Sequence, residues 1–224
     1  MGGHADTATT PGIRERYLDL IERSLTNDIY GESSVEMALR QLAIKLRHPW
    51  VTRHWTNVWP ARAHTMIGRA RLSHLRRLTE ATLRDGVPGD YIETGVWRGG
   101  ACILMRAVLA AHEVTDRQVF VADSFEGLPR PNASAYPADA RDRLHSFADL
   151  AVSEAQVRRN FEAYGLLDEQ VVLVKGLFRD TLPTLRQKRF ALIRLDGDMY
   201  ESTTDALVNL YDRLSGGGYV VIDD

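Results

Sequence analysis

The sequence predicts an α/β protein in which a mostly parallel, doubly wound sheet follows a set of extra N-terminal helices. After residue 89, short apolar segments typical of buried strands alternate with segments of helical periodicity. Before it, apolar residues recur every three to four positions, which is the spacing of amphipathic helices. We expect a disordered tail at 1–12 and one domain at 13–224, divided into a helical region at 13–89 and a sheet core at 90–224.

Three helices are predicted in the N-terminal region. The apolar face of the first consists of Ile13, Tyr17, Leu20, Ile21 and Leu25. The second begins near Ser33 and Ser34, where Glu36 is placed like the acid of a capping box, and ends near His48 because Pro49 disfavours helix in the residue before it. After a Trp-rich loop, the third helix runs over residues 65–83.

The core elements follow in regular alternation. Strands are expected at 91–94, 119–123, 171–174, from 191 onward and at 219–222, and helices at 100–111, 153–164 and 201–214. Glycines 216–218 are expected to turn the chain before the last strand. Because the sequence stops directly after that strand, we expect the natural protein to be longer at its C-terminus.

The composition of the chain argues against several classes of protein. A content of 44% hydrophobic and 26% charged residues is that of a globular protein, and no apolar run approaches the ~20 residues of a membrane helix. The N-terminus lacks the pattern of a secretory signal, and the single cysteine, Cys102, cannot form an internal disulfide. We therefore expect a cytoplasmic protein with no membrane partner.

Charge is unevenly distributed along the chain. Residues 40–84 contain ten Lys or Arg and one acid, so this segment carries +9 and, with a total of −2, the remainder carries −11. Basic residues interleaved with tryptophan can indicate nucleic-acid binding. The simpler interpretation is a helical layer whose arginines pair with the acidic remainder, and we expect no nucleic-acid partner.

Aspartates follow the last two predicted strands. Asp196 comes after the fourth, and Asp223 and Asp224 come after the fifth. Carboxyl ends of parallel strands meet at one edge of a sheet, so neighbouring strands would bring these carboxylates together. Such a cluster predicts a hard, oxygen-binding cation. This account requires that no lysine or arginine head group fills the space between the carboxylates.

The loop after the first strand predicts a cofactor site. Its glycines, at 95, 99 and 100, do not have the spacing of the dinucleotide fingerprint, which disfavours an NAD-dependent oxidoreductase. Glu93 would repel phosphate and favour a cation, and Asp123 at the end of the second strand suits two ribose hydroxyls. S-adenosylmethionine meets both demands. The alternative is that Glu93 caps the following helix or accepts backbone N–H groups.

The motifs together resemble one family. The matching stretches are TMIG (65–68), YIETGVWRGGA (91–101), ADSFEGLP (122–129), KGLFRDTLP (175–183), LDGDMYES (195–202) and GGYVVIDD (217–224). They resemble the macrocin O-methyltransferase (TylF-type) family, which methylates sugar hydroxyls of antibiotics. Within it, the chain most resembles the branch that methylates noviose in aminocoumarin (novobiocin-type) biosynthesis.

The resemblance implies a class I S-adenosylmethionine-dependent methyltransferase with a Rossmann-like sheet, Mg²⁺ dependence and a homodimer whose N-terminal helices help to close the site. It implies a small-molecule glycoside as substrate and Asp196, Asp223 and Asp224 as metal ligands. The cofactor-binding residues that it implies are Thr65, Met66, Glu93, Thr94, Gly95, Trp97, Gly99, Asp123, Ser124, Phe125, Gly176 and Phe178.

Asp198 is the predicted general base, because it lies two residues past Asp196 on the same loop and can approach a hydroxyl of a metal-chelated vicinal diol. The alternative is that Asp198 caps the helix that begins near Tyr200. A catechol-type small-phenol O-methyltransferase would also use a diol and Mg²⁺. Residues 130–150 are too long for a simple connection and predict a lid, with Tyr136 or His145 touching the substrate, or else a disordered excursion.

Overall fold

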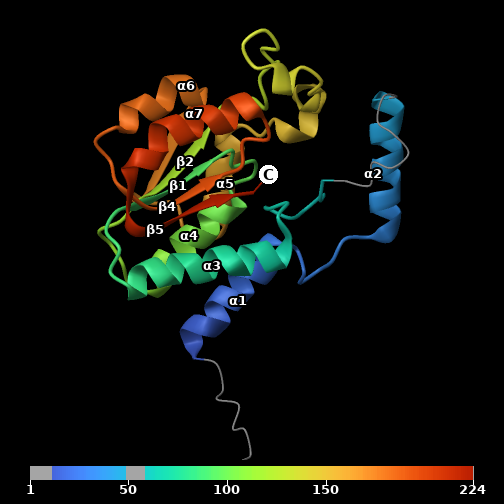
Figure 1. The fold of residues 1–224 in the computed structure, drawn as a ribbon. Helices are drawn as coiled ribbons and strands as arrows, with labels where there is room; N and C mark the ends of the chain where they lie inside the picture. Colours follow the sequence, from blue (N-terminus) through green and yellow to red (C-terminus); the bar gives the residue numbers. More distant parts are fainter. Residues whose placement is uncertain (1–11, 49–58, 224) are drawn as a thin grey trace, which may run out of the picture.

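The computed structural model describes residues 12–48 and 59–223, so the predicted tail and most of the Trp-rich loop lie outside the described residues. Five parallel strands form one sheet in the order β3-β2-β1-β4-β5. They are β1 (Asp90–Thr94), β2 (Val119–Asp123), β3 (Val171–Lys175), β4 (Phe190–Leu195) and β5 (Leu214–Ile222). Helices lie on both faces of the sheet (Figure 1), which confirms the predicted fold class.

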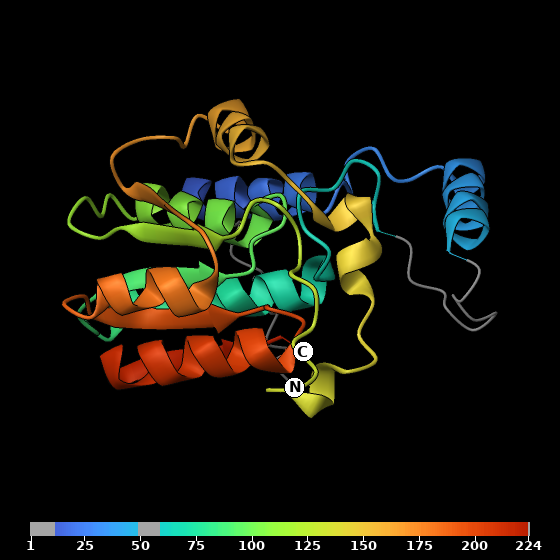
Figure 2. The ribbon, with the colours of Figure 1, turned by 90° about the horizontal axis from the view of Figure 1, so that it is seen from above.

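The α-helices of the described residues are α1 (Ile13–Leu25), α2 (Ser34–Arg47), α3 (Gly68–Arg84), α4 (Gly100–Ala111), α5 (Glu154–Ala163), α6 (Phe178–Thr181) and α7 (Tyr200–Leu210). All of them except α2 belong to two layers, which the apolar contacts identify. One apolar core joins α1, α3, α4 and α5 to one face of the sheet, and a second joins α7 and the turn after α6 to the other face. Figure 2 shows the layers from above. The bounds of α4 and β2 are those that the sequence predicts.

The last strand begins earlier than predicted. Glycines 216–218 lie inside β5, where the register with β4 shifts between Phe190 and Leu192. A Cβ at Gly218 would lie 2.6 Å from the carbonyl oxygen of Ala191, so the bulged strands approach too closely for a side chain. The prediction of a turn at 216–218 is therefore wrong. The helix before β5 ends at Leu210, and a short 3₁₀ turn at 211–213 connects it to the strand.

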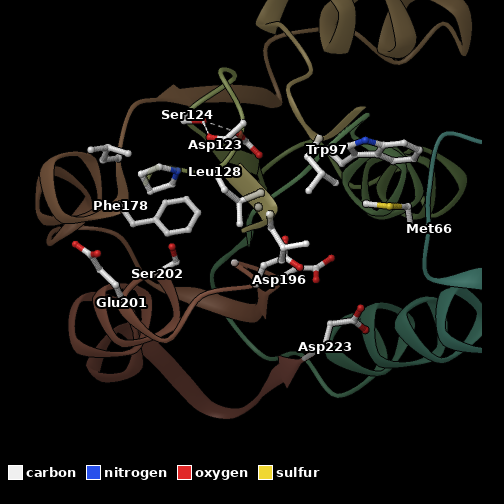
Figure 3. Close-up of a pocket in the computed structure, with 18 of the residues that line it drawn as sticks. Met66, Trp97, Asp123, Ser124, Leu128, Phe178, Asp196, Glu201, Ser202 and Asp223 are labelled. Carbon is white, nitrogen blue, oxygen red and sulfur yellow. Dashed lines mark hydrogen bonds between the residues drawn. The ribbon is translucent and has the colours of Figure 1, made fainter. Parts of the chain in front are cut away.

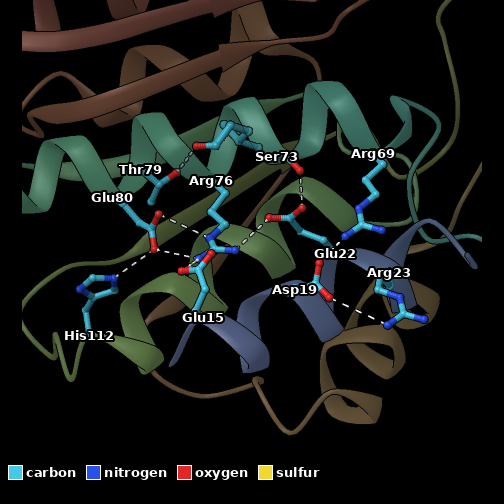
Figure 4. A network of polar contacts seen from close by, with 11 residues as sticks. Glu15, Asp19, Glu22, Arg23, Arg69, Ser73, Arg76, Thr79, Glu80 and His112 are labelled. Carbon is cyan, nitrogen blue, oxygen red and sulfur yellow. Dashed lines mark hydrogen bonds and ion pairs between the residues drawn. The ribbon is translucent and has the colours of Figure 1, made fainter. Parts of the chain in front are cut away.

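The basic segment pairs with acids of the N-terminal helices. Arg76 of α3 is buried and contacts Glu15 and Glu22 of α1 as well as Glu80 of its own helix (Figure 4). Arg69 pairs with Asp19 of α1 in the same network. These contacts fit the interpretation of a helical layer whose arginines neutralise acids. The buried face of α1 differs from the predicted one, since Leu18 is buried whereas Ile13 and Leu20 are exposed.

Helix α2 stands apart from the rest of the protein in Figure 1. Its N-cap is Ser33, whose Oγ accepts the N–H of Glu36 at 3.5 Å, as the capping pattern predicts. None of its residues is buried, and a row of apolar side chains is exposed along it: Val35, Leu39, Leu42 and Leu46. In the described part of the chain, no helix has the length and apolar character needed to cross a bilayer.

Candidate active site

A cavity of about 420 Å³ lies at the carboxyl ends of the strands, the edge at which open α/β sheets bind ligands (Figure 3). All five strands contribute to its lining through the loops that follow them. These lining residues are Gly95 and Trp97 after β1, Asp123 at the end of β2 with Ser124, Gly127, Leu128 and Pro129 after it, Gly176, Leu177 and Phe178 after β3, Asp196, Gly197 and Asp198 after β4, and Asp223 after β5.

Most of the predicted site residues line this cavity. Of the cofactor candidates, the structure brings together Met66, Gly95, Trp97, Asp123, Ser124, Gly176 and Phe178. The candidates outside the lining are Thr65, Glu93, Thr94, Gly99 and Phe125. The predicted base, Asp198, and two predicted metal ligands, Asp196 and Asp223, also line it, whereas Asp224 lies outside the described residues.

Asp123 is held by the backbone of two loops. Its Oδ2 accepts the N–H of Val96 and its Oδ1 accepts the N–H of Phe125, each at 2.8 Å. Burial raises the pKa of Asp123, and these backbone N–H groups oppose that rise by favouring the ionised form. An acceptor at the end of the second strand is thus fixed toward the cavity. Phe125 contributes through its backbone rather than as a lining side chain.

Glu93 lies in the protein interior instead of facing a ligand. It is 2% exposed, it forms an ion pair with Arg194, and the thiol of Cys102 donates to its Oε2 at 2.9 Å. Burial raises the pKa of Glu93 to about 7, although Arg194 favours the charged form. The expectation that Glu93 attracts a cationic ligand, and the alternative that it caps a helix, are both unsupported, because its described partners are side chains of the core.

Arg194 bridges the carboxylates that follow the last two strands. Its Nη1 donates to Oδ2 of Asp196 at 2.8 Å, and its Nη2 forms an ion pair with Oδ2 of Asp223 at 2.9 Å. Arg71 of α3 donates to the same oxygen of Asp223 at 2.9 Å. The aspartates therefore do converge, but guanidinium groups balance their charge. The condition that no arginine head group lies between the carboxylates is therefore not met, and the premise that only a metal could balance their charge is wrong.

The carboxylates of Asp196 and Asp223 are nevertheless suitable ligands for a hard cation that enters from the cavity. Asp196 and Asp223 line the cavity and Arg194 does not, so Arg194 contacts the carboxylates from their buried side. Carboxylate oxygens are the ligands that Mg²⁺ prefers, and hydrogen-bonded partners behind them are usual. Among residues 12–48 and 59–223, no three acidic, histidine or cysteine side chains converge as a metal site. The third predicted ligand, Asp224, lies outside these ranges.

Asp198 does not supply the cap of α7. It lines the cavity from a left-handed backbone conformation with a φ of 61°. The first N–H groups of the helix, those of Tyr200 and Glu201, donate instead to the carboxylate of Asp139, at 2.8 and 2.9 Å. Asp139 comes from the segment predicted to be a lid. The structure thus assigns the capping role to a residue that sequence spacing could not identify.

The segment 130–150 forms three short 3₁₀ turns beside the cavity. Leu144 and Leu150 line the cavity, whereas Tyr136 and His145 do not. The ring of Tyr136 lies 6.3 Å from that of Tyr200, between centroids, so its contact is with α7. The lining residues that the sequence analysis missed include Arg71, Leu128, Arg179, Glu201 and Asp205. The matched motifs contain Leu128, Arg179 and Glu201 and could have indicated them.

Comparison with known proteins places the chain in a family. Residues 14–224 match the family model of macrocin-O-methyltransferase (TylF). One relative from Streptomyces olivaceus is 51% identical over 96% of this chain and 81% of its own length. Its name is 8-demethyl-8-(2,3-dimethoxy-α-L-rhamnosyl)-tetracenomycin-C 4′-O-methyltransferase. The demethyldecarbamoylnovobiocin O-methyltransferase of Streptomyces niveus is 49% identical over 93% of this chain and 79% of its own.

A solved structure agrees with these relatives. The O-methyltransferase NovP superposes with a TM-score of 0.82 at 47% identity, covering 94% of this chain and 84% of its own. The novobiocin relative and this structure confirm the resemblance inferred from the motifs. The cavity at the strand ends lies where open α/β folds bind ligands. The chain belongs to the macrocin-O-methyltransferase (TylF) family and is an O-methyltransferase.

Proposed function

We propose that the protein transfers the methyl group of S-adenosylmethionine to a deoxysugar hydroxyl of a glycosylated antibiotic intermediate, with Asp198 as general base and Mg²⁺ as its metal. The observation that carries this proposal is one cavity lined both by Asp123 at the end of β2 and by Asp196, Asp198 and Asp223 after β4 and β5. Family membership excludes the oxidoreductase interpretation. The relatives' names support an acceptor that carries a sugar.

The β1 and β2 side of the cavity suits the cofactor. Asp123 presents a carboxylate whose position two backbone N–H groups hold, as a pair of ribose hydroxyls requires. Apolar and aromatic side chains nearby, Leu177 and Phe178, suit a planar adenine ring. Trp97 is fixed because its Nε1 donates to the carbonyl of Asp149 at 2.8 Å. This leaves the β4 and β5 side of the cavity for the acceptor.

The reaction is a direct displacement at the methyl carbon. The acceptor oxygen forms a bond to that carbon while the carbon–sulfur bond breaks, and the electron pair passes to sulfur to give S-adenosylhomocysteine. The hydroxyl proton passes to the carboxylate of Asp198. The chain contributes by holding acceptor and cofactor in line, which supplies much of the rate enhancement in such transfers.

Asp196, Asp223 and Asp224 would hold Mg²⁺. When bound, the ion supplies Lewis acidity that lowers the pKa of a coordinated hydroxyl. Supporting this, the cavity lining carries six carboxylates and two guanidinium groups, an excess of negative charge that attracts a divalent cation. The lining carboxylates are Asp123, Asp196, Asp198, Glu201, Asp205 and Asp223.

Mass spectrometry of glycosides incubated with the protein, S-adenosylmethionine and Mg²⁺ tests the function. We expect a product heavier by one methylene unit, loss of product on chelation, and recovery with Mg²⁺. Calorimetric titration with Mg²⁺ gives a second readout, in which Asp196→Asn should weaken binding and the exposed Asp116→Asn should not. Methylation of catechols but of no glycoside would support the small-phenol alternative. Full activity without divalent ion would contradict the metal assignment.

We also propose that the protein is a homodimer in which α2 packs on the second copy. The exposed apolar row of Val35, Leu39, Leu42 and Leu46 supports this, because such a face is costly in water. Light scattering should give twice the chain mass for the wild type and the chain mass for Leu39→Glu. The control Arg47→Glu, also exposed on α2, should remain dimeric. A monomeric wild type would refute the proposal.

A further inference from the structure

Asp139 binds the start of a helix far from it in sequence. Its carboxylate is buried, with the residue 5% exposed, and both oxygens are used. Oδ1 accepts the N–H of Tyr200 at 2.8 Å, and Oδ2 accepts that of Glu201 at 2.9 Å. These two hydrogen bonds join the 3₁₀ turn Pro137–Asp139 to α7, and Asp139 and Tyr200 are 61 residues apart in the sequence.

The start of α7 lacks a local cap. The N-cap position is Met199, whose side chain accepts no hydrogen bond, and the first N–H groups of a helix have no partner within the helix. Asp139 supplies the missing acceptors, and its negative charge suits the positive end of the helix dipole. The ring of Tyr136, which precedes this turn, lies 6.3 Å from the ring of Tyr200. The turn thus packs on α7 and caps it.

The capped end of α7 directly follows the loop that carries the reactive carboxylates. Asp196 and Asp198 lie within four residues of Tyr200, and Asp198 is held in a left-handed conformation. A free helix start would loosen the C-terminal end of this loop, because that end is anchored at the first turn of α7. The N–H of Asp196 donates to the carbonyl of Thr94 at 2.9 Å, so β1 anchors the other end.

The segment that carries Asp139 also forms a wall of the cavity. Leu128 and Pro129 line the cavity before Asp139, and Leu144 and Leu150 line it afterwards, whereas Asp139 itself is outside the lining. The far end of the segment is held at Asp149, whose carbonyl accepts from Trp97 Nε1. In Figure 2 the segment runs from the end of β2 to the start of α7 and back toward α5.

We propose that Asp139 is a positioning residue for methyl transfer, which holds the loop 196–199 in place by capping α7 and couples that loop to the wall formed by residues 130–150. The inference rests on the proposed function, since it assigns this loop the acceptor side of the site. Asp139 touches neither cofactor nor acceptor, because it does not line the cavity. Its removal should therefore lower turnover while leaving cofactor affinity unchanged.

The test compares Asp139→Ala and Asp139→Asn with Asp142→Ala. Asp142 is a matched control, because its carboxylate accepts a backbone N–H, that of Leu144 at 2.8 Å, but within its own segment. Amide hydrogen exchange followed by NMR should show Tyr200 and Glu201 exchanging about tenfold faster in Asp139→Ala, the factor expected from losing a cap. Asn retains one acceptor oxygen, so its effect should be smaller. Asp142→Ala should match the wild type at both amides.

Kinetics and cofactor binding supply the second readout. In Asp139→Ala we expect kcat to fall about tenfold or more, with the Kd for S-adenosylhomocysteine within about twofold of the wild type. If Asp139→Ala does not fold, Asp139→Asn serves for both measurements. Wild-type exchange at Tyr200 and Glu201 in the variant overturns the inference, and so does faster exchange with unchanged kcat. A wild type that methylates no glycoside counts against the proposed function, and hydrogen exchange then decides this inference alone.

Discussion

Nη1 of Arg194 lies 2.8 Å from Oδ2 of Asp196, inside the protein and behind the cavity that Asp196 lines. The same guanidinium pairs with Glu93 on β1 and Asp223 after β5. One buried cation thus connects the ends of three strands. This arrangement orients the carboxylates toward the cavity, and it gives them a counter-charge whether or not a metal is bound.

Replacing Arg194 should strongly destabilise the protein. Arg194→Met leaves buried carboxylates without their partner, and removing one member of a buried ion pair costs about 3–5 kcal/mol. Arg84→Met is the control, because Arg84 is exposed and its ion pair among the described residues is with Asp85, a surface contact that contributes little to stability. Urea unfolding measures both free energies. Similar values for the two variants would show that the network is of little importance.

Gly95 is expected to tolerate no side chain. Its φ is 86°, and a Cβ there would lie 1.9 Å from the carbonyl oxygen of Asp196, so Gly95→Ala must displace the backbone after β4. We expect a loss of several kcal/mol, or a protein that does not fold. Gly86→Ala is matched, since its φ of 64° brings the same strain but nothing lies within 4 Å of the added Cβ. That control should cost only about 1 kcal/mol in thermal or urea unfolding. Equal losses would contradict the close contact.

Asp198→Asn should separate chemistry from binding. The variant keeps the size of the side chain but cannot accept the hydroxyl proton, so kcat should fall by about 10²–10⁴. The Kd for S-adenosylhomocysteine, measured by calorimetry, should not change, because Asp198 lies on the β4 side of the cavity. The exposed Asp212→Asn should retain wild-type turnover. Near-normal turnover in Asp198→Asn would refute the base assignment.

The folded protein should lose stability in mild acid partly through His64. Burial, aided by the nearby Arg98, lowers the pKa of His64 below its ordinary value of about 6.5. The unfolded chain therefore takes up a proton that the folded state resists. The contribution of neutral His64 to the free energy of unfolding is complete above about pH 6.5, and it is lost as the pH falls through that value toward the pKa of the folded state.

His64→Gln isolates this effect, since the amide can still bond to the hydroxyl of Tyr164, which lies 3.0 Å from Nδ1 of His64. Urea unfolding at about pH 7.5 and about pH 5.5 should show a smaller loss of stability in the variant. The raised pKa of Glu93 has the opposite effect on stability, because the folded protein binds a proton at Glu93 more readily than the unfolded chain and so gains stability as the pH falls. This effect is the same in the wild type and in the variant. Identical losses in the two proteins would rule out the contribution of His64.

The regular elements could be predicted because their signals are local. The bounds of α4 and β2, the alternation of strands and helices, and the Ser33 cap of α2 all follow from hydrophobic periodicity and capping chemistry within about ten residues. Glycines 216–218 show the limit of such signals. Taken alone they indicate a turn, and only pairing with β4 places them in a bulged strand.

The sequence by itself also indicated many of the residues that gather at the cavity, because parallel strands deliver the residues after their carboxyl ends to one edge. Only the tertiary structure decided how the charges there are balanced. Arg194 lies in an apolar strand that gives no hint of its three partners, and the cap of α7 comes from Asp139, 61 residues away. Local patterns report burial and turns, whereas the partner of a buried charge depends on which distant segments the fold brings together.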